Sequence, residues 1–230
     1  MNPLPAGWTL LAFGSQQLAV PDRLAPLAEA GWMSATRPDA QPVTAGGRQA
    51  AWFVDGPHGP AVLRHYRRGG LRAHLGRTHY CWLGLARVRA LAEVRVLAHL
   101  RQSGVPVPEP LAAAYWRTGP WYRNAILVRR IPSARPLVHC LDVAQPQRVA
   151  GALRAMHAAG VWHADLNAWN IVLDGNQQVW LIDFDRARLG VVSRKQAQKN
   201  WLRLRRSLVK VAGLRGAQWW DGLSLCLPRS

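Results

Sequence analysis

The sequence predicts an α+β fold with two lobes, because strand-like runs dominate its first half and helical periodicity its second. Two short apolar runs, residues 51–54 and 61–66, enclose a segment dense in Gly and Pro, which predicts a hairpin. Apolar residues then recur on one face over residues 86–102, which predicts a helix. We therefore expect an amino lobe at residues 1–132 and a smaller carboxy lobe at residues 133–230.

The remaining elements follow from the same patterns. Strands are expected at residues 111–116, 125–128, 171–173 and 179–182, and helices at residues 147–159 and 194–211. Residues 1–45 mix Trp, Pro and short apolar stretches without sustained periodicity. They are treated as an extension of the amino lobe without assigned elements.

The composition indicates an anionic partner. Lys and Arg number 30 against 12 for Asp and Glu, a net charge of +18, which suits nucleic acid, an acidic membrane or a phosphorylated substrate. Three Cys without a Cys-x-x-Cys pair argue against a disulfide framework or a structural zinc site and favour a reducing compartment. No apolar run approaches the roughly 20 residues that cross a bilayer, so a soluble or peripheral protein is expected.

One constellation carries chemistry. His163 and Asp165 are followed by Asn170, and Asp183 comes after a short predicted hairpin, directly before Phe184. His-x-Asp-x-x-x-x-Asn followed by Asp-Phe is the catalytic-loop and metal-binding pattern of kinases. Asp165 can supply a carboxylate near an attacking hydroxyl, and Asn170 and Asp183 can supply oxygen ligands for Mg²⁺. The alternative is that Asp165 and Asn170 cap turns and that Asp183 only ends a strand.

Two further features accompany this constellation. Only 12 acidic residues exist in the chain, yet four of them lie from Asp165 to Asp185, which favours a cation site over a solvated face. His163 is interpreted as an anchor for the backbone of the catalytic loop, and a satisfied core histidine is nearly the same interpretation.

Candidate nucleotide-binding residues lie in the first half. Kinases hold the phosphates of ATP with a cation on the third strand of the amino lobe, paired with a helical Glu. Arg64 occupies the strand position where Lys is usual, and Glu93 is the candidate partner. Alternatively, Glu93 pairs with Arg89, four residues earlier on its own helix. Gly46 and Gly47 could form the loop that covers the phosphates, although a plain turn fits them equally well.

Several segments of the chain are similar to those of one enzyme family. The Arg-rich third strand and the Asp-Phe-Asp-Arg sequence after the hairpin are more selective than the catalytic-loop motif. The chain resembles the lipopolysaccharide kinase family, and within it the 3-deoxy-D-manno-octulosonic acid (Kdo) kinases of Gram-negative bacteria. The segments that carry the resemblance are residues 62–70, 130–137, 163–167, 180–186 and 202–208.

The resemblance implies a protein-kinase-like two-lobe fold with a reduced carboxy-terminal lobe. It implies ATP-dependent phosphorylation, with Mg²⁺, of the Kdo 4-hydroxyl on a Kdo–lipid A precursor at the cytoplasmic face of the inner membrane. It also implies Asp165 as the active-site residue, with Asn170 and Asp183 at the metal positions. The chain departs from the family pattern in its Gly-Gly-Arg-Gln run at residues 46–49 and in the bulky Trp169.

The implied partners suit the charge of the chain. An acceptor that carries phosphates and a Kdo carboxylate is anionic, and so is the inner membrane beneath it. The helix expected at residues 194–211 has one apolar face, made of Trp201, Leu204, Leu208 and Val211, while Arg203, Arg206 and Lys210 lie elsewhere. This arrangement is typical of a membrane-surface helix. The alternative is an ordinary helix that packs on the lobe. No nucleic-acid partner is expected, and the sequence does not predict the oligomeric state.

The sequence is also compatible with other functions. The chain could phosphorylate another small molecule, another glycolipid or a protein, although the short stretch after Asp183 lacks an Ala-Pro-Glu motif and leaves little room for a peptide platform. It could also be a catalytically dead kinase-like binding module, which the absence of Lys at position 64 favours. The retention of Asp165, Asn170 and Asp183 together favours an active enzyme.

Overall fold

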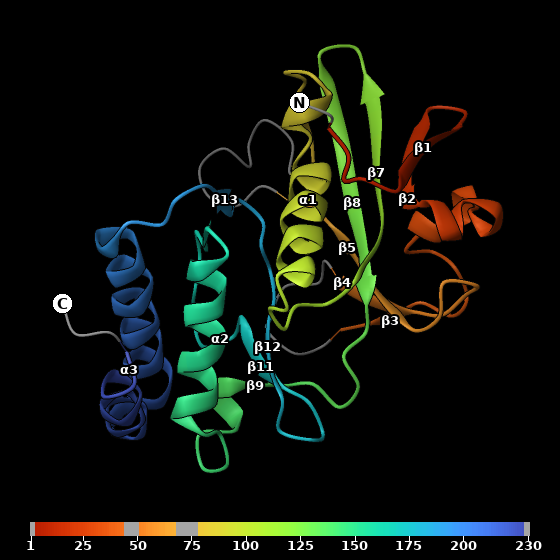
Figure 1. The fold of residues 1–230 in the computed structure, drawn as a ribbon. Helices are drawn as coiled ribbons and strands as arrows, with labels where there is room; N and C mark the ends of the chain where they lie inside the picture. The colour runs from red at the N-terminus through yellow and green to blue at the C-terminus, as the bar shows by residue number, and fades with distance from the viewer. Residues whose placement is uncertain (1–2, 44–50, 68–77, 228–230) are drawn as a thin grey trace. The chain divides into compact units, whose positions relative to one another are not determined.

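The computed structural model describes residues 3–43, 51–67 and 78–227, which form two compact units (Figure 1). The first unit comprises Met1–Ala98 and Glu109–Arg130, and the second comprises His99–Pro108 and Ile131–Ser230. Within the described residues, no helix combines the length and the apolarity that are needed to cross a bilayer.

An antiparallel sheet forms the body of the first unit. Its strand order is β1-β2-β7-β8-β5-β4-β3, and β6 pairs with β8. The strands are β1 (Trp8–Phe13), β2 (Gln16–Pro21), β3 (Gln41–Pro42), β4 (Ala51–Val54), β5 (Ala61–His65), β6 (Tyr80–Cys81), β7 (Pro110–Thr118) and β8 (Trp121–Arg129). The predicted hairpin is confirmed, since β4 and β5 pair antiparallel with Ala51 opposite Arg64 and Val54 opposite Ala61.

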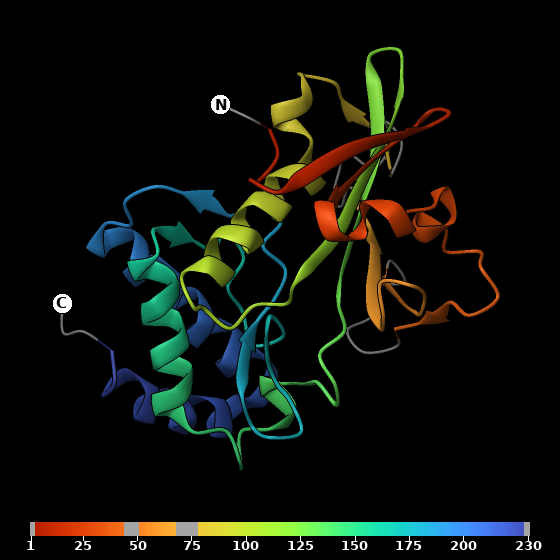
Figure 2. The ribbon, with the colours of Figure 1, turned by 45° about the vertical axis from the view of Figure 1, so that its right-hand side comes forward.

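Different segments cover the two faces of this sheet (Figure 2). On one face lies helix α1 (Arg89–Gln102), whose Ala90 amide donates to the side-chain oxygen of the buried Asn124 on β8. On the other face lie two 3₁₀ segments, η1 (Asp22–Leu27) and η2 (Ala30–Met33), while a third, η4 (Leu85–Arg87), precedes α1. Because side chains alternate along a strand, consecutive residues of β5 are directed to opposite faces.

The region that the sequence left unassigned completes this unit. Within residues 1–45, β1 and β2 form a hairpin that extends the sheet beyond β7, and η1 and η2 follow it. Trp32 and Met33 of η2 are fully buried against apolar side chains of the strands. The short elements and the 3₁₀ geometry explain why no sustained periodicity was visible.

The second unit consists of helices and short strands. Its elements are β9 (Arg135–Pro136), η5 (Leu137–His139), α2 (Pro146–Ala158), β10 (Val161–Trp162), β11 (Ile171–Leu173), β12 (Val179–Leu181), β13 (Arg188–Leu189) and α3 (Arg194–Ser224). Strands β12, β11 and β9 form one antiparallel sheet, and β10 pairs with β13. The β11–β12 hairpin and helix α2 agree with the sequence prediction.

Helix α3 is longer than predicted and bends. It begins with a capping box, in which Ser193 and Gln196 satisfy each other's backbone amides. The expected helix at residues 194–211 continues to Ser224, past Gly213, where φ is 55° and the helical geometry breaks. The bend brings the backbone at Gly216 close to the carbonyl of Leu208, and a Cβ at Gly216 would lie only 2.2 Å from that oxygen.

The amphipathic face of α3 packs inside the second unit. Of the residues predicted to face the membrane, Leu204 and Leu208 are fully buried, and the ring of Trp201 lies 6.0 Å from that of His157. Val211, at the end of this face, is 41% exposed. For this face the alternative interpretation, a helix packing on its own lobe, is the one that the structure shows. The fold class, an α+β chain, is as predicted.

Candidate active site

The predicted ion pair of the first unit is present. Arg64, on β5, places its Nη2 atom 2.5 Å from Oε2 of Glu93, on α1. Glu93 is only 4% exposed, and the hydroxyl of Tyr66 donates to the same oxygen. Side chains from one strand region, those of Arg64 and Tyr66, therefore help to hold the carboxylate. The half-buried guanidinium of Arg64 is the cationic end of the pair. Gly46 and Gly47, the candidate phosphate loop, lie outside the described residues.

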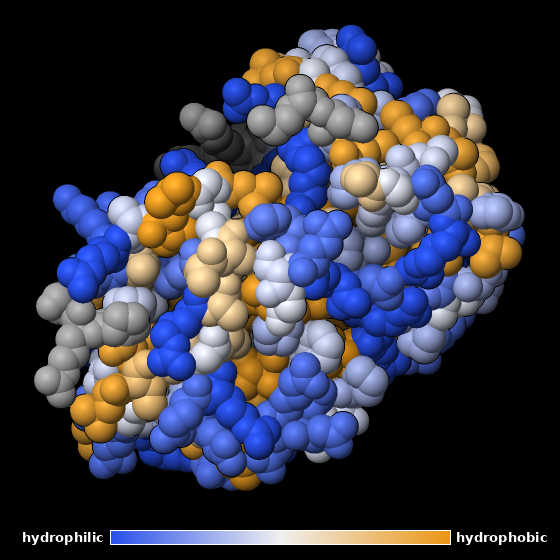
Figure 3. Space-filling view, in the orientation of Figure 1, coloured by the Kyte–Doolittle hydropathy of each residue, from blue (hydrophilic) through white to orange (hydrophobic). Residues whose placement is uncertain are grey.

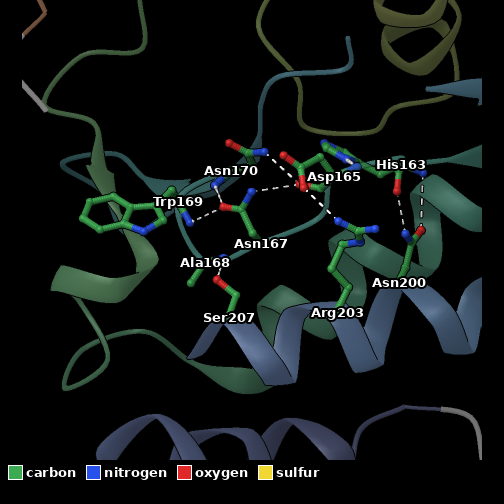
Figure 4. Close-up of polar contacts among 9 residues, drawn as sticks. All are labelled: His163, Asp165, Asn167, Ala168, Trp169, Asn170, Asn200, Arg203 and Ser207. Carbon is green, nitrogen blue, oxygen red and sulfur yellow. Dashed lines mark hydrogen bonds and ion pairs between the residues drawn. The ribbon is translucent and has the colours of Figure 1, made fainter. Parts of the chain in front are cut away.

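The catalytic-loop segment of the second unit runs between β10 and β11 and is organised by its own side chains (Figure 4). The backbone carbonyl of Asp165 accepts hydrogen bonds from the side-chain amides of Asn167 and Asn170, each at 2.9 Å. Oδ1 of Asn167 in turn accepts from the backbone amides of Trp169 at 2.8 Å and of Asn170 at 3.2 Å. These bonds hold the loop in one shape and leave the Asp165 side chain 55% exposed.

Asn170 and Asp183 are linked through the backbone. The carbonyl of Asn170 accepts from the amide of Ile182 at 3.0 Å, so that the end of the loop lies beside the residue that precedes Asp183. Because Nδ2 of Asn170 donates to Asp165, Oδ1 is the end of this buried amide that remains for a cation. Asp183 adopts a left-handed conformation with φ of 62°. A carboxylate and an amide oxygen are hard donors that fit Mg²⁺.

His163 anchors the loop, as predicted. Its ring is fully buried and lies 4.8 Å from that of Phe184. Nδ1 accepts from the amide of Asp165 at 3.1 Å, and Nε2 donates to the carbonyl of Ile182 at 3.1 Å. Burial lowers the pKa of His163, which outweighs the opposing effect of the Ile182 hydrogen bond. A neutral imidazole therefore joins the backbone beside Asp165 to the backbone before Asp183.

Helix α3 holds the same loop at three points (Figure 4). The side chain of Asn200, fully buried, accepts from the amide of His163 at 3.3 Å and donates to its carbonyl at 2.6 Å. Nη1 of Arg203 lies 3.0 Å from Oδ1 of Asp165. Oγ of Ser207 accepts from the amide of Ala168 at 3.1 Å. Residues three and four apart share a helix face, so one face of α3 presents all three contacts.

Sequence reasoning did not identify these three α3 residues as part of the site. A signal was present for Asn200, a polar residue in the apolar stripe that Ala197, Leu204 and Leu208 form. A buried polar side chain needs hydrogen-bond partners, so its place in that stripe could have indicated a structural contact. For Arg203, one arginine among many, the sequence offered no comparable signal.

The acidic residues near the motif do not all serve the site. Asp174 caps the turn of the β11–β12 hairpin, where it accepts from Nε1 of Trp180 at 3.0 Å and from the amide of Gln178 at 2.9 Å. The interpretation of four neighbouring acids as one cation site is therefore wrong for Asp174. Within residues 3–43, 51–67 and 78–227, no group of three or more His, Cys, Asp and Glu side chains is arranged to hold a metal ion. The candidate ligands are Asp183 and the amide of Asn170.

The bulky residue before Asn170 is accommodated by an aromatic contact. The ring of Trp169 meets that of His139, at the end of η5, edge-on at 5.1 Å. Trp169, which departs from the family pattern, therefore fills space beside the loop, and the loop hydrogen bonds remain in place.

Comparison with known proteins identifies the family. Residues 36–224 match the model of the lipopolysaccharide kinase (Kdo/WaaP) family. The chain belongs to this family. Membership confirms the predicted kinase-like α+β fold and makes the chain a phosphotransferase that acts on a hydroxyl group, with ATP as the donor that the family implies.

Individual members of the lipopolysaccharide kinase family are similar over most of their length. A 3-deoxy-D-manno-octulosonic acid kinase of Stenotrophomonas maltophilia is 48% identical over 183 residues, which are 78% of this chain and 74% of the relative. One from Xanthomonas campestris pv. campestris is 46% identical over 194 residues, 82% of this chain and 78% of the relative. One from Xylella fastidiosa is 45% identical over 180 residues, 76% and 72% of the two chains.

Proposed function

We propose that the chain transfers the γ-phosphoryl group of ATP to a hydroxyl of Kdo in a Kdo–lipid A precursor, a step of lipopolysaccharide core biosynthesis. The observation that carries the proposal is the exposed Asp165 on a loop whose end, at Asn170, is hydrogen-bonded to the residue before Asp183. The relatives of the chain are named for Kdo phosphorylation. The 4-hydroxyl is the position that the family resemblance implies.

Asp165 is the proposed catalytic base. Its carboxylate accepts the proton of the acceptor hydroxyl while the hydroxyl oxygen bonds to the γ-phosphorus and the bond from that phosphorus to the oxygen of ADP breaks. The backbone of Asp165 is held by His163, Asn167 and Asn170, so its position does not depend on bound substrate. Asn170 and Asp183 would hold Mg²⁺, which neutralises charge on the phosphates when it is bound.

The first unit supplies the proposed nucleotide contacts. Arg64 binds phosphate oxygens of ATP, and the buried Glu93 orients the guanidinium. Gly46 and Gly47 remain proposed as the loop that covers the phosphates. In this assignment residues 1–132 act as the amino lobe and bind the nucleotide, while residues 133–230 act as the carboxy lobe and supply the catalytic loop.

Transfer of radiolabelled γ-phosphate tests the proposal. Purified protein with ATP and Mg²⁺ is expected to label Kdo–lipid IVA and to leave lipid IVA without Kdo unlabelled. If neither lipid is labelled by folded protein that still binds ATP, the acceptor is a different molecule. If the protein fails to bind ATP as well, a catalytically dead binding module explains the chain better.

We also propose peripheral contact with the anionic cytoplasmic face of the inner membrane. One exposed face of α3 carries Leu202, Arg206, Val209 and Lys210. Just past the bend, Leu214 is 83% exposed. Figure 3 shows hydrophobic side chains scattered among hydrophilic ones on the face in view. Mixed basic and apolar surface on a chain of net charge +18 suits anionic lipid.

Vesicle flotation tests the membrane contact. The protein is expected to float with vesicles that contain anionic phospholipid and to remain unbound with zwitterionic ones. Val209→Asp combined with Leu214→Asp should weaken flotation, whereas Leu27→Asp, at an exposed leucine of the first unit, should not. Equal flotation of all variants would remove this face of α3 from the proposal.

A further inference from the structure

The contact between Arg203 and Asp165 uses only part of the guanidinium. Arg203 stands on α3 and approaches the loop through Nη1, which lies 3.0 Å from Oδ1 of Asp165. A guanidinium has five N–H donors in a planar fork. Among the residues that the structure describes, Asp165 is the only acceptor that is hydrogen-bonded to the guanidinium of Arg203. The side chain is 43% exposed, and its other N–H groups have no hydrogen-bond partner among the described residues beside the proposed catalytic base.

The position of Arg203 is set by the helix and not by the salt bridge alone. One turn earlier, Asn200 is clamped to both backbone polar groups of His163, and one turn later Ser207 accepts from Ala168. The guanidinium therefore projects from a rigid element at a fixed height along the loop. A surface ion pair with both partners about half exposed contributes little to stability, typically below about 1 kcal/mol, so stability alone does not account for it.

The acceptor supplies an anion that fits this place. The relatives are named for a sugar acid, and the carboxyl group of such a sugar is ionised at neutral pH. A carboxylate brought near Asp165 is repelled by the carboxylate of that residue unless a cation stands between them. Arginine binds carboxylates with two parallel hydrogen bonds, and Arg203 retains the donors for such a bond.

We propose that Arg203 is a specificity-determining residue that binds the carboxylate of the acceptor sugar while it keeps the Asp165 carboxylate in place. The inference rests on the proposed function and assigns the group on the acceptor that is recognised beside the reacting hydroxyl. It makes the negative charge of the sugar, and not only its hydroxyl, a condition for efficient transfer.

A comparison of two acceptors in two enzymes tests this inference. The acceptors are Kdo–lipid IVA and its analogue in which the Kdo carboxylate is converted to the carboxamide. In the wild-type enzyme the carboxamide should lower kcat/KM by about 10- to 100-fold, mainly through KM, because a charge-assisted hydrogen-bonded pair is lost. In Arg203→Gln the acid acceptor should lose a similar factor, and the ratio between the acceptors should fall close to one.

Arg205→Gln is the matched control, because it removes an exposed arginine from the same helix and should preserve the wild-type ratio. Arg203→Lys keeps the charge without the fork and should give an intermediate ratio, which also serves if Arg203→Gln does not fold. A wild-type ratio in both Arg203 variants, or no discrimination by the wild-type enzyme, would overturn the inference. Failure of the wild-type enzyme to phosphorylate either acceptor would instead refute the proposed function.

Discussion

At the scale of single residues, the backbone of Asp165 has a structural role, whereas its side chain is free of the hydrogen bonds that shape the loop. Its backbone amide and carbonyl are bound by His163, Asn167 and Asn170, whereas its carboxylate contacts Arg203 and is largely exposed. Because the backbone hydrogen bonds and the contacts of Asn200 and Ser207 also hold the loop, the carboxylate is available for chemistry. The loop should therefore keep its conformation when the carboxylate is replaced.

Asp165→Asn removes the proposed base while preserving shape. We expect kcat to fall about 10²- to 10⁴-fold, the usual contribution of general base catalysis, with ATP binding nearly unchanged. Turnover with Kdo–lipid IVA and equilibrium dialysis of ATP measure the two effects. An unchanged turnover would exclude Asp165 from the mechanism.

Arg64 gives the corresponding prediction for the nucleotide. Arg64→Ala should raise KM for ATP by about 10-fold or more, because a charged hydrogen-bond donor to phosphate is lost, while KM for the lipid acceptor changes little. Arg67→Ala, at an exposed arginine three residues later, is the control and should leave both constants unaltered. Steady-state kinetics with each substrate varied in turn distinguish the two, and equal effects of both variants would contradict a specific phosphate contact.

At the scale of elements, the bend in α3 depends on two glycines. Gly213 adopts φ of 55°, and Gly216 lies against the Leu208 carbonyl. Gly216→Ala would place a Cβ 2.2 Å from that oxygen. Because the oxygen belongs to the backbone, relief of the clash requires the helix itself to shift. We expect a loss of about 1–3 kcal/mol in the free energy of unfolding, as for other overpacked sites.

Urea denaturation of this variant and of Gly151→Ala measures the effect. Gly151 lies inside α2 with nothing within 4 Å of an added Cβ, so alanine there should be neutral or stabilising by up to about 1 kcal/mol. If both substitutions have the same effect, close packing at Gly216 is not what the bend requires.

The elements that the sequence predicted correctly are those with local signals. The hairpin of β4 and β5 carries its turn residues between two apolar runs, and α1 and α2 show apolar residues at helical spacing. The segment before β3 lacks such a signal, because β1 and β2 become strands only by pairing with each other and with β7. Propensity is a weak guide where long-range pairing decides the structure.

The same distinction applies to the candidate site. Asp165, Asn170 and Asp183 were visible because the spacing of a loop and a hairpin is local in sequence. The contacts from Arg203 and Ser207 join residues 38 and 39 positions apart and depend on where α3 packs, which no local pattern encodes. The pair of Arg64 and Glu93, 29 residues apart, was predicted only because kinases supply a precedent for it.

At the scale of the whole molecule, buried and half-buried histidines should make the protein sensitive to mild acid. Burial lowers the pKa of His58 and His65 in the first unit and of His157 and His163 in the second, each from an ordinary value of 6.5. Above pH 6.5 these histidines are neutral in both the folded and the unfolded chain. As the pH falls below it, the unfolded chain binds protons that the folded chain does not, so the free energy of unfolding decreases.

Each such histidine can contribute up to about 1.4 kcal/mol per pH unit below its unfolded pKa. Urea unfolding at about pH 7.5 and about pH 5.5 should therefore show a clear loss of stability in acid. His58→Gln should reduce the difference, because one of the groups is removed. Carboxylates with lowered pKa, such as that of Asp39, change the free energy of unfolding only near and below pH 3.8, so they do not contribute between about pH 7.5 and about pH 5.5. Equal stability at both pH values would contradict the prediction.

The spacing of the three α3 contacts has a consequence for how the gene can vary in length. Asn200, Arg203 and Ser207 reach one loop because they are three and four residues apart on a helix that turns about 100° per residue. One inserted or deleted residue between Asn200 and Ser207 would rotate at least one contact away from its partner. Functional relatives should accordingly have no insertions or deletions in this segment. Changes of length should accumulate beyond the bend at Gly213, where the rotation of the helix no longer determines its contacts with the loop.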